Sequence, residues 1–411
     1  MRILFDKCPI CGGSESEVLL TFKNSMRFLF DDFRPVALQK RICKQCGHIF
    51  CDRYHTFEEL QNHYQIARDS AENLIYNAND NLDELFTNLA QWFYKSTRMK
   101  EPQSRIENIL DLGCGKCDLL ESFGEIYAKA ELHGVDFSPQ SLSYGKKKGI
   151  ENIFVGNFLE QQFDGLDFDI ISATGILEHQ IDLDSFLRKI ISLCHEGTYL
   201  LIEVPDSHAI IKERSDLKAK YMHDICNDEH VHHFNLSNLE SLLGQYNFSL
   251  ADYRTIQRGD WQALDAICQY QEKDTNGSAS AQPLATNPFL AEDILKVFTQ
   301  KRSKYLEKFQ KRIAGYQNLG IYGAGWHTSI LLPAFFEMPF ERIKVIFDQD
   351  SRKVNKKLFG TTICYPEKEL IQELDAVLIS SIDMEESIFD YLVDLGISST
   401  KIIRLYEALD R

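Results

Sequence analysis

The feature that most constrains the fold of this 411-residue chain is a short glycine segment after the apolar residues 109–110. This segment carries Asp111, Gly113 and Gly115, and a later apolar run ends at Asp136. Glycine lets the backbone approach a ligand where a Cβ atom would collide. A carboxylate after the next strand is placed to accept hydrogen bonds from a ribose diol. Asp136 lies 21 positions after Gly115, close to the spacing of about 20 in a strand–turn–helix–strand nucleotide-binding unit.

The same segment indicates which kind of nucleotide is bound. Dinucleotide-binding proteins carry three glycines in the pattern G-x-G-x-x-G, with the pyrophosphate at the helix N-terminus. In this chain Asp118 occupies the place of the third glycine. The segment therefore favours a nucleoside ligand without a pyrophosphate, and S-adenosyl-L-methionine fits best.

Three more residues are expected to complete the nucleoside pocket. Asn157 follows the third predicted strand, where its amide can accept from the adenine amino group and donate to a ring nitrogen. Phe137 is expected to stack on the adenine, with packing in the core as the alternative. Thr174 begins the loop after the fourth strand. Because ligands of open α/β sheets bind beyond the carboxyl ends of the strands, these residues should converge there.

The pattern of apolar runs predicts an α/β protein with two Rossmann-like units in tandem. Strands and helices alternate in the larger unit, which favours a parallel sheet flanked by helices. Its strands are predicted at 109–112, 132–136, 152–155, 168–173 and 198–203. The predicted domains are a cysteine-bearing module (1–60), a helical connector (61–104), a nucleoside-binding core (105–270), a linker (271–290) and a second Rossmann-like domain (291–411).

The second unit repeats the pattern of the first. A long amphipathic helix with an apolar stripe over residues 294–313 precedes it. Gly323 and Gly325 then form a second glycine turn, and Asp348 follows Gly325 by 23 positions. Further strands are predicted at 343–347, 376–379 and 401–405. Whether this turn holds a ligand or is only a tight connection stays open.

Composition excludes several classes of function. The formal net charge of −16 repels phosphate backbones, so no nucleic-acid partner is expected. No apolar run reaches about 18 residues, and Asp6, Lys7 and Cys8 interrupt the first apolar stretch, so neither a membrane span nor a signal peptide is expected. Eleven cysteines without a secretory signal favour a reducing, cytoplasmic location with thiols used for metal.

Four cysteines have the spacing of a metal site. Cys8 and Cys11 form one C-x-x-C pair, and Cys43 and Cys46 form another, with 31 residues between the pairs. Four thiolates at tetrahedral corners make a closed, structural zinc site. Two redox pairs or free thiols are the alternative. Cys51 lies near the second pair but lacks a partner at this spacing.

A polar segment after the last predicted strand of the core carries candidate catalytic residues. Glu229 and His230 form an acid–imidazole pair suited to general-base catalysis, because histidine titrates near neutral pH and a carboxylate orients its ring. The alternatives are a surface histidine cluster or a second metal site made by His230, His232 and His233.

These motifs resemble those of known enzymes. The Asp-x-Gly-x-Gly segment, the acid after the second strand and Leu-Glu-His at 177–179 resemble the class I methyltransferase signature. With the cysteine module before it and the second Rossmann-like unit after it, the chain resembles the sugar C-methyltransferases, which act on nucleotide-linked 4-keto-deoxysugars. The resemblance implies that His230 removes the proton beside the ketone, with Glu229 as its partner. It also implies that Tyr64 supplies an aromatic hydroxyl and that the last domain helps to hold the nucleotide-sugar.

The sequence departs from this family on the acceptor side. Asn227 stands where the family usually has a tyrosine, and residues 257–261 replace its usual strand motif. The glycine turn of the last domain also differs. The acceptor, a small molecule that we expect to be a nucleotide-linked sugar, and the choice between carbon and oxygen methylation therefore stay open. An RNA methyltransferase with a zinc module and a non-catalytic nucleotide-sugar-binding protein are the remaining alternatives.

Overall fold

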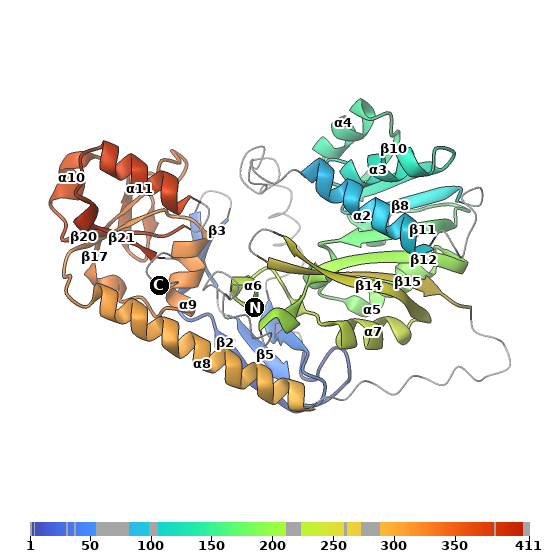
Figure 1. The fold of residues 1–411 in the computed structure, drawn as a ribbon, viewed down its shortest axis with the longest axis horizontal. Coiled ribbons are helices and arrows are strands. Elements are labelled where there is room, and N and C mark those ends of the chain that lie inside the picture. The colour runs from blue at the N-terminus through green and yellow to red at the C-terminus, as the bar shows by residue number, and fades with distance from the viewer. Residues whose placement is uncertain are drawn as a thin grey trace.

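The computed structural model describes ten segments of the chain, and all structural statements below concern them. The segments are 2–3, 5–29, 32–36, 38–54, 82–97, 106–210, 223–258, 261–272, 288–381 and 384–405. The predicted α/β class is confirmed, since two sheets of mainly parallel strands carry helices and lie at opposite ends of the molecule (Figure 1). A smaller antiparallel sheet, formed mostly by the N-terminal residues, lies between them.

The larger sheet has seven strands in the order β10-β9-β8-β11-β12-β15-β14. All five strands predicted for it are present, and neighbours among them pair in parallel. They are β8 (Asn108–Leu112), β9 (Glu131–Asp136), β10 (Asn152–Val155), β11 (Phe168–Thr174) and β12 (Cys194–Pro205). An antiparallel pair, β14 (Phe248–Arg258) and β15 (Trp261–Tyr270), completes the edge. The strand order reverses between β8 and β11, and open α/β sheets bind their ligands at such a reversal.

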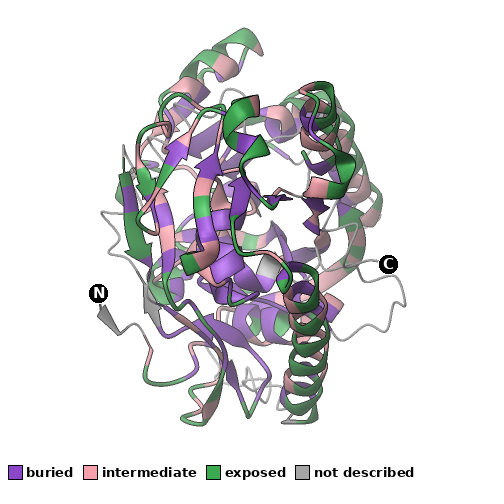
Figure 2. Ribbon diagram, turned by 90° about the vertical axis from the view of Figure 1, so that its left-hand side faces the viewer, coloured by how far each residue is buried: buried purple, intermediate pink, exposed green. Residues whose placement is uncertain are grey.

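Helices cover both faces of this sheet because its strands are apolar on both faces. Ile109 belongs to the core on one face and Leu110 to the core on the other. The first core includes Phe93 of α2 and Phe123 of α3, whose rings lie 5.5 Å apart. The helices are α2 (Leu82–Thr97), α3 (Asp118–Ile126), α4 (Gln140–Lys147), α5 (Leu183–Ile191) and α7 (Leu236–Gly244). Figure 2, which is viewed from the end of the molecule that carries the second Rossmann-like sheet, shows strands that are mostly buried and helices whose outer faces are exposed.

The cysteine-bearing sheet is antiparallel and includes one strand from far along the chain. Its order is β13-β6-β5-β2. The strands are β2 (Ser16–Thr21), β5 (Gln39–Cys43), β6 (Ile49–Cys51) and β13 (His232–His233). Beside it lie the hairpin of β3 (Ser25–Leu29) and β4 (Asp32–Val36) and the short pair β1 (Arg2–Ile3) and β7 (Arg53–Tyr54). Because β13 pairs with β6, the predicted catalytic segment is an edge of this sheet.

The second Rossmann-like sheet has six strands in the order β18-β19-β17-β16-β20-β21. The strands are β16 (Leu319–Tyr322), β17 (Ile343–Phe347), β18 (Lys357–Leu358), β19 (Thr361–Cys364), β20 (Ala376–Ile379) and β21 (Ile402–Arg404). The strand predicted at 401–405 is thus shorter, because a 3-10 turn (Ser399–Lys401) precedes it. The helices are α9 (Leu332–Ala334), α10 (Lys368–Gln372) and α11 (Glu385–Asp394).

Helix α8 (Pro288–Ile313) confirms the predicted amphipathic helix and joins the N-terminal module to the second sheet (Figure 1). Its Ile294 shares one core cluster with Ile42 of β5, and its Ile313 shares the same cluster with Leu319 of β16. The N-terminal module and the last domain therefore form one hydrophobic core. No helix within the ten described segments is long and apolar enough to cross a membrane.

Candidate active site

The glycine segment turns tightly at the carboxyl end of β8. Gly113 has a φ of +74°, and its N–H donates to Val135 O of β9 at 2.7 Å. A Cβ atom at this position would lie 2.3 Å from Cδ1 of Ile176, so the Ile176 side chain would have to move. The left-handed backbone favours glycine at this position, and the packing of Ile176 against it adds to that preference.

Asp136 is held by the backbone of this turn. Its Oδ2 accepts from Gly115 N at 2.8 Å, and its Oδ1 accepts from Ser138 N at 2.8 Å. The side chain is buried at the carboxyl end of β9. Backbone donors therefore fix both carboxylate oxygens at the edge of the sheet where the sequence predicts the ribose.

Asp111 lies deeper than the sequence suggested. It is buried, and its Oδ1 accepts from Ser172 Oγ of the neighbouring β11 at 2.7 Å. Burial raises the pKa of Asp111 to about 7, the Ser172 hydrogen bond opposes this, and the charge of Asp136 adds to it. The hydrogen bond between Asp111 and Ser172 therefore joins β8 and β11, the two strands between which the sheet order reverses.

The other three residues predicted for the nucleoside pocket lie at the carboxyl ends of strands of the same sheet. Asn157 is buried and accepts from Leu159 N at 3.1 Å through Oδ1, so that it caps the turn after β10. Phe137 is partly exposed directly after β9, and Thr174 is partly exposed at the last position of β11. The structure thus brings these residues to the same edge of the sheet as Gly113.

The loop after β11 connects the predicted nucleoside pocket to a group of acid and imidazole side chains. It begins at Gly175 and reaches the 3-10 turn Leu177–His179, one residue after the Ile176 that packs on Gly113. Polar side-chain atoms of Glu178, His179 and His230 all lie within 4.8 Å of one another. The His179 and His230 rings are 4.9 Å apart and nearly perpendicular.

The predicted pair Glu229 and His230 has partners that sequence reasoning did not identify. The Glu229 carboxylate binds Nη1 of Arg27 at 2.6 Å, and Nε of Arg27 donates to Asp228 Oδ2 at 2.7 Å. The carboxylate that lies near the His230 ring is instead that of Glu178. Arg27 is the only charged residue within Ser-Met-Arg-Phe-Leu of β3, and this isolation is the signal that could have identified it.

Strands of the N-terminal module hold the backbone carbonyl groups of His230 and Val231. His230 O accepts from Lys40 Nζ of β5, which is fully buried, and from Cys51 Sγ of β6 at 3.3 Å. Val231 O accepts from Cys51 N at 2.8 Å. The base candidate therefore belongs to a segment of the core that is held by strands of another module.

The alternative of a metal held by His230, His232 and His233 lacks support in the contacts. His232 Nε2 lies 3.0 Å from Gln180 O and so must donate to it, while its Nδ1 lies 3.2 Å from Nε2 of His48. Burial holds the pKa of both imidazoles low, to about 3 for His48. With both ring nitrogens engaged, His232 has no lone pair for a metal.

The four predicted metal-site cysteines come together. Their sulfur atoms lie within 4.8 Å of one another, with 3.6 Å between Cys8 and Cys46 and 3.5 Å between Cys11 and Cys43. These separations exceed a disulfide bond of about 2.05 Å, and the four cysteines are free. Four converging thiols fit the tetrahedral donor set of structural zinc. Cys51 lies outside the group.

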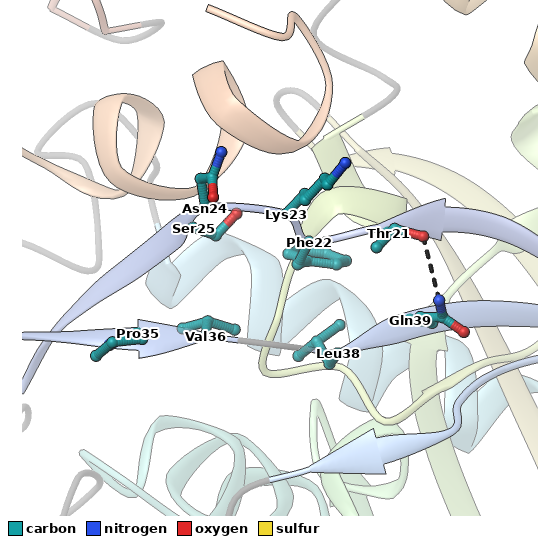
Figure 3. A pocket seen from close by; sticks show the side chains of 9 residues that line it. All are labelled: Thr21, Phe22, Lys23, Asn24, Ser25, Pro35, Val36, Leu38 and Gln39. Atoms are coloured by element: carbon teal, nitrogen blue, oxygen red, sulfur yellow. Dashed lines mark hydrogen bonds between the residues drawn. The ribbon is translucent and has the colours of Figure 1, made fainter. Parts of the chain in front are cut away.

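Two features fall outside this site. A hollow in the N-terminal module is lined by residues 21–25, 35–36 and 38–39, and none of the donor or catalytic candidates lines it (Figure 3). Tyr64, the predicted aromatic hydroxyl, lies outside the described residues, as do residues 273–287 of the predicted linker.

Comparison with known proteins identifies the larger sheet. Residues 71–253 match the family model of a methyltransferase domain. Among solved structures, the chain is similar to the 1,6-didemethyltoxoflavin-N1-methyltransferase of Burkholderia thailandensis, with a TM-score of 0.39 and 15% identity over 58% of this chain and 99% of that chain. It is also similar to the N-methyltransferase NodS of Bradyrhizobium japonicum WM9, with a TM-score of 0.38 and 13% identity over 51% and 99% of the two chains.

A third structure, an O-methyltransferase family protein of Burkholderia thailandensis, gives a TM-score of 0.37 and 15% identity over 53% of this chain and 63% of that chain. The match thus spans less than two thirds of that protein. The glycine segment, the strand order and the family match together identify a methyltransferase domain within residues 71–253.

Proposed function

We propose that this methyltransferase transfers the methyl group of S-adenosyl-L-methionine, the donor, to a nucleotide-linked ketosugar, with His230 as the general base. The observation that carries the proposal is the group of Glu178, His179 and His230, which begins two residues after the Ile176 packed on the donor turn. A base close to the donor methyl suits an acceptor that must lose a proton before it can attack. The small-molecule nature of the acceptor is consistent with the acidic chain, which carries a net charge of −16.

On the donor side, each residue has a proposed role. Gly113 and Gly115 let the backbone lie against the nucleoside, and Asp136 accepts from the ribose hydroxyls. Phe137 and Asn157 face the adenine, and Thr174 lies at the end of β11 beside the methionine portion. Asp111 supports the turn through its hydrogen bond with Ser172.

On the acceptor side, His230 takes a proton from the carbon beside the ketone, and the C–H electron pair enters the enolate. That carbon then bonds to the donor methyl as the S–CH3 bond breaks, and its electron pair returns to sulfur. The protein aligns the two carbons, and the positive charge on His230 is offset by Glu178. In this scheme Glu229 has a positioning role, since Arg27 binds its carboxylate.

The cysteine group supports a structural zinc site at Cys8, Cys11, Cys43 and Cys46. A structural zinc ion would stabilise the knuckles from which β5 and β6 extend. Because β6 pairs with β13, the zinc site would also support the backbone of the base. Free thiols used for zinc are consistent with the proposed cytoplasmic location.

The second glycine turn supports a role of the last domain in holding the nucleotide. Asp348 accepts from Ala324 N and Asp350 N, each at 2.8 Å, in the way that Asp136 accepts from Gly115 N and Ser138 N. A ligand there would adjoin the acceptor segment, because Trp326 Nε1 donates to Asp228 Oδ1 at 3.0 Å. We also propose the domain division that the sequence pattern predicts, with a connector at 61–104 and a linker at 271–290.

The test is incubation of the enzyme with labelled donor and a panel of nucleotide-sugars, with products identified by mass. We expect a mass gain of one methyl group on a ketosugar and no label in the product of the His230→Gln variant, which should still bind the donor. His208→Gln, on an exposed residue, is the matched control. Labelling of RNA, or of no member of the panel, would contradict the proposal.

A further inference from the structure

The environment of His230 contains a residue that sets which of its ring nitrogens carries the proton. Asn227 follows the short helix α6 (His223–Cys226), and its Nδ2 lies 3.0 Å from Nε2 of His230. Its Oδ1 lies 2.9 Å from the backbone nitrogen of Glu229. Both ends of one amide group are therefore engaged inside a stretch of four residues.

The orientation of this amide follows from its backbone partner. The Glu229 N–H can only donate, so the Asn227 atom that faces it must be the oxygen. The amide nitrogen then faces His230, and because this nitrogen only donates, Nε2 of a neutral His230 must accept. The proton of the neutral ring consequently lies on Nδ1. A fixed partner on one ring nitrogen determines the tautomer of a histidine.

We propose that Asn227 is a positioning residue that keeps His230 in the Nδ1–H tautomer, with Nε2 as its proton-accepting atom. This inference rests on the proposed role of His230 as base. The acceptor displaces the Asn227 amide from Nε2 on binding, and the C–H proton moves to Nε2 while its electron pair enters the enolate. The amide oxygen stays engaged with Glu229 N–H, so Asn227 offers no acceptor to a protonated Nε2 and favours the neutral ring.

Contacts with the N-terminal module hold residues 228–230 in place and so support the contact between Asn227 and His230. Arg27 binds the side chains of Asp228 and Glu229, and Lys40 and Cys51 bind the backbone oxygen of His230. The N-terminal module thus holds the two residues between Asn227 and His230 and the backbone of His230 itself.

The test is nitrogen-15 NMR of histidine-labelled enzyme, because two-bond nitrogen–proton correlations distinguish the Nδ1–H and Nε2–H tautomers. The chain has 12 histidines, so the His230 signals are assigned by their loss in His230→Gln. We expect Nδ1–H in the wild type. In Asn227→Asp a carboxylate that only accepts replaces the amide nitrogen, so His230 should become Nε2–H or doubly protonated.

Turnover should fall when His230 is no longer in the Nδ1–H tautomer. We expect a loss of about 100-fold or more in Asn227→Asp, the scale of general-base catalysis, with unchanged donor affinity. Asn227→Leu, which imposes neither tautomer, should lose less, and it serves if Asn227→Asp fails to fold. An Nε2–H signal in the wild type, or an Asn227→Asp enzyme with the wild-type signal and turnover, would overturn the inference. Absence of turnover on every ketosugar would instead refute the proposed function, since the NMR result does not depend on it.

Discussion

Arg27 of β3 and Asp228 of the acceptor segment form an ion pair across 201 positions of the chain, with Nε and Oδ2 2.7 Å apart and both side chains buried. Trp326 of the last domain donates to the same carboxylate. One buried aspartate therefore joins the cysteine-bearing module, the methyltransferase core and the last domain, one residue before Glu229.

Removing this arginine should destabilise the enzyme strongly. In Arg27→Met the carboxylate of Asp228 stays buried without its main counter-charge, which costs about 3–5 kcal/mol when one partner of a buried pair is lost. Turnover should fall too, because Glu229 loses the same partner. Denaturant unfolding followed by fluorescence measures the first effect.

Arg34 provides the matched control. It lies opposite Arg27 in the register of the β3–β4 hairpin, but it is exposed. Arg34→Met should change the free energy of unfolding by about 0.5 kcal/mol or less. Equal effects of the two substitutions would contradict the role given to the buried pair.

The two glycine turns can be distinguished by their aspartates. Asp136→Asn should weaken binding of S-adenosylhomocysteine about 10-fold or more, because hydrogen bonds to a charged group are among the stronger ones. Asp348→Asn changes the equivalent position of the second sheet and should leave this affinity unchanged. Calorimetric titration of both variants decides the matter, and a reversed order would place the donor in the last domain.

Gly113→Ala should be much more harmful than Gly165→Ala, although both glycines have a φ of +74°. Either alanine bears the left-handed backbone, at about 1–2 kcal/mol. At position 113 the new Cβ also meets Ile176, whereas at position 165 nothing lies within 4 Å. Gly113→Ala should therefore lose donor binding as well as stability. Comparable melting temperatures and donor affinities in the two variants would refute the close approach.

Stability should depend on pH through Asp111. Burial raises the pKa of Asp111 from 3.8 to about 7 in the folded chain. Between these values the folded state holds a proton that the unfolded state has released, so this stabilisation is complete below about pH 4 and is lost as pH rises through 7. Asp111→Asn cannot ionise. Its free energy of unfolding should therefore rise relative to the wild type between pH 4 and 8; parallel curves would speak against a buried, protonated Asp111.

Loss of the cysteine site should affect catalysis through β13. Cys46→Ser should lower the zinc content from one ion per chain and reduce turnover, because the knuckles support the sheet that holds His230. Cys364→Ser, in β19 of the last domain, is the control and should retain its zinc and its activity. Elemental analysis and the methyl-transfer assay measure both effects. A zinc-free Cys46→Ser enzyme with full activity would separate the metal from the acceptor site.

The sequence by itself was enough to predict those features that depend on local pattern. The strands that end at Leu112 and Asp136 follow from apolar runs, and the turn at Gly113 follows from its glycine spacing. The meeting of Cys8 with Cys46 was predictable because four thiols at knuckle spacing have few other uses. The edge of the sheet at which Phe137, Asn157 and Thr174 lie follows from the rule that parallel strands end together.

Only the tertiary structure decided which groups surround His230. The sequence suggested its neighbour Glu229 as the acid, but adjacent residues in an irregular segment need not face the same way. In the folded chain the Glu229 carboxylate binds Arg27 of another module, and the carboxylate near the His230 ring is that of Glu178. Such partners lie about 50 to 200 positions apart, and packing of the modules, rather than any local preference of the backbone, brings them together.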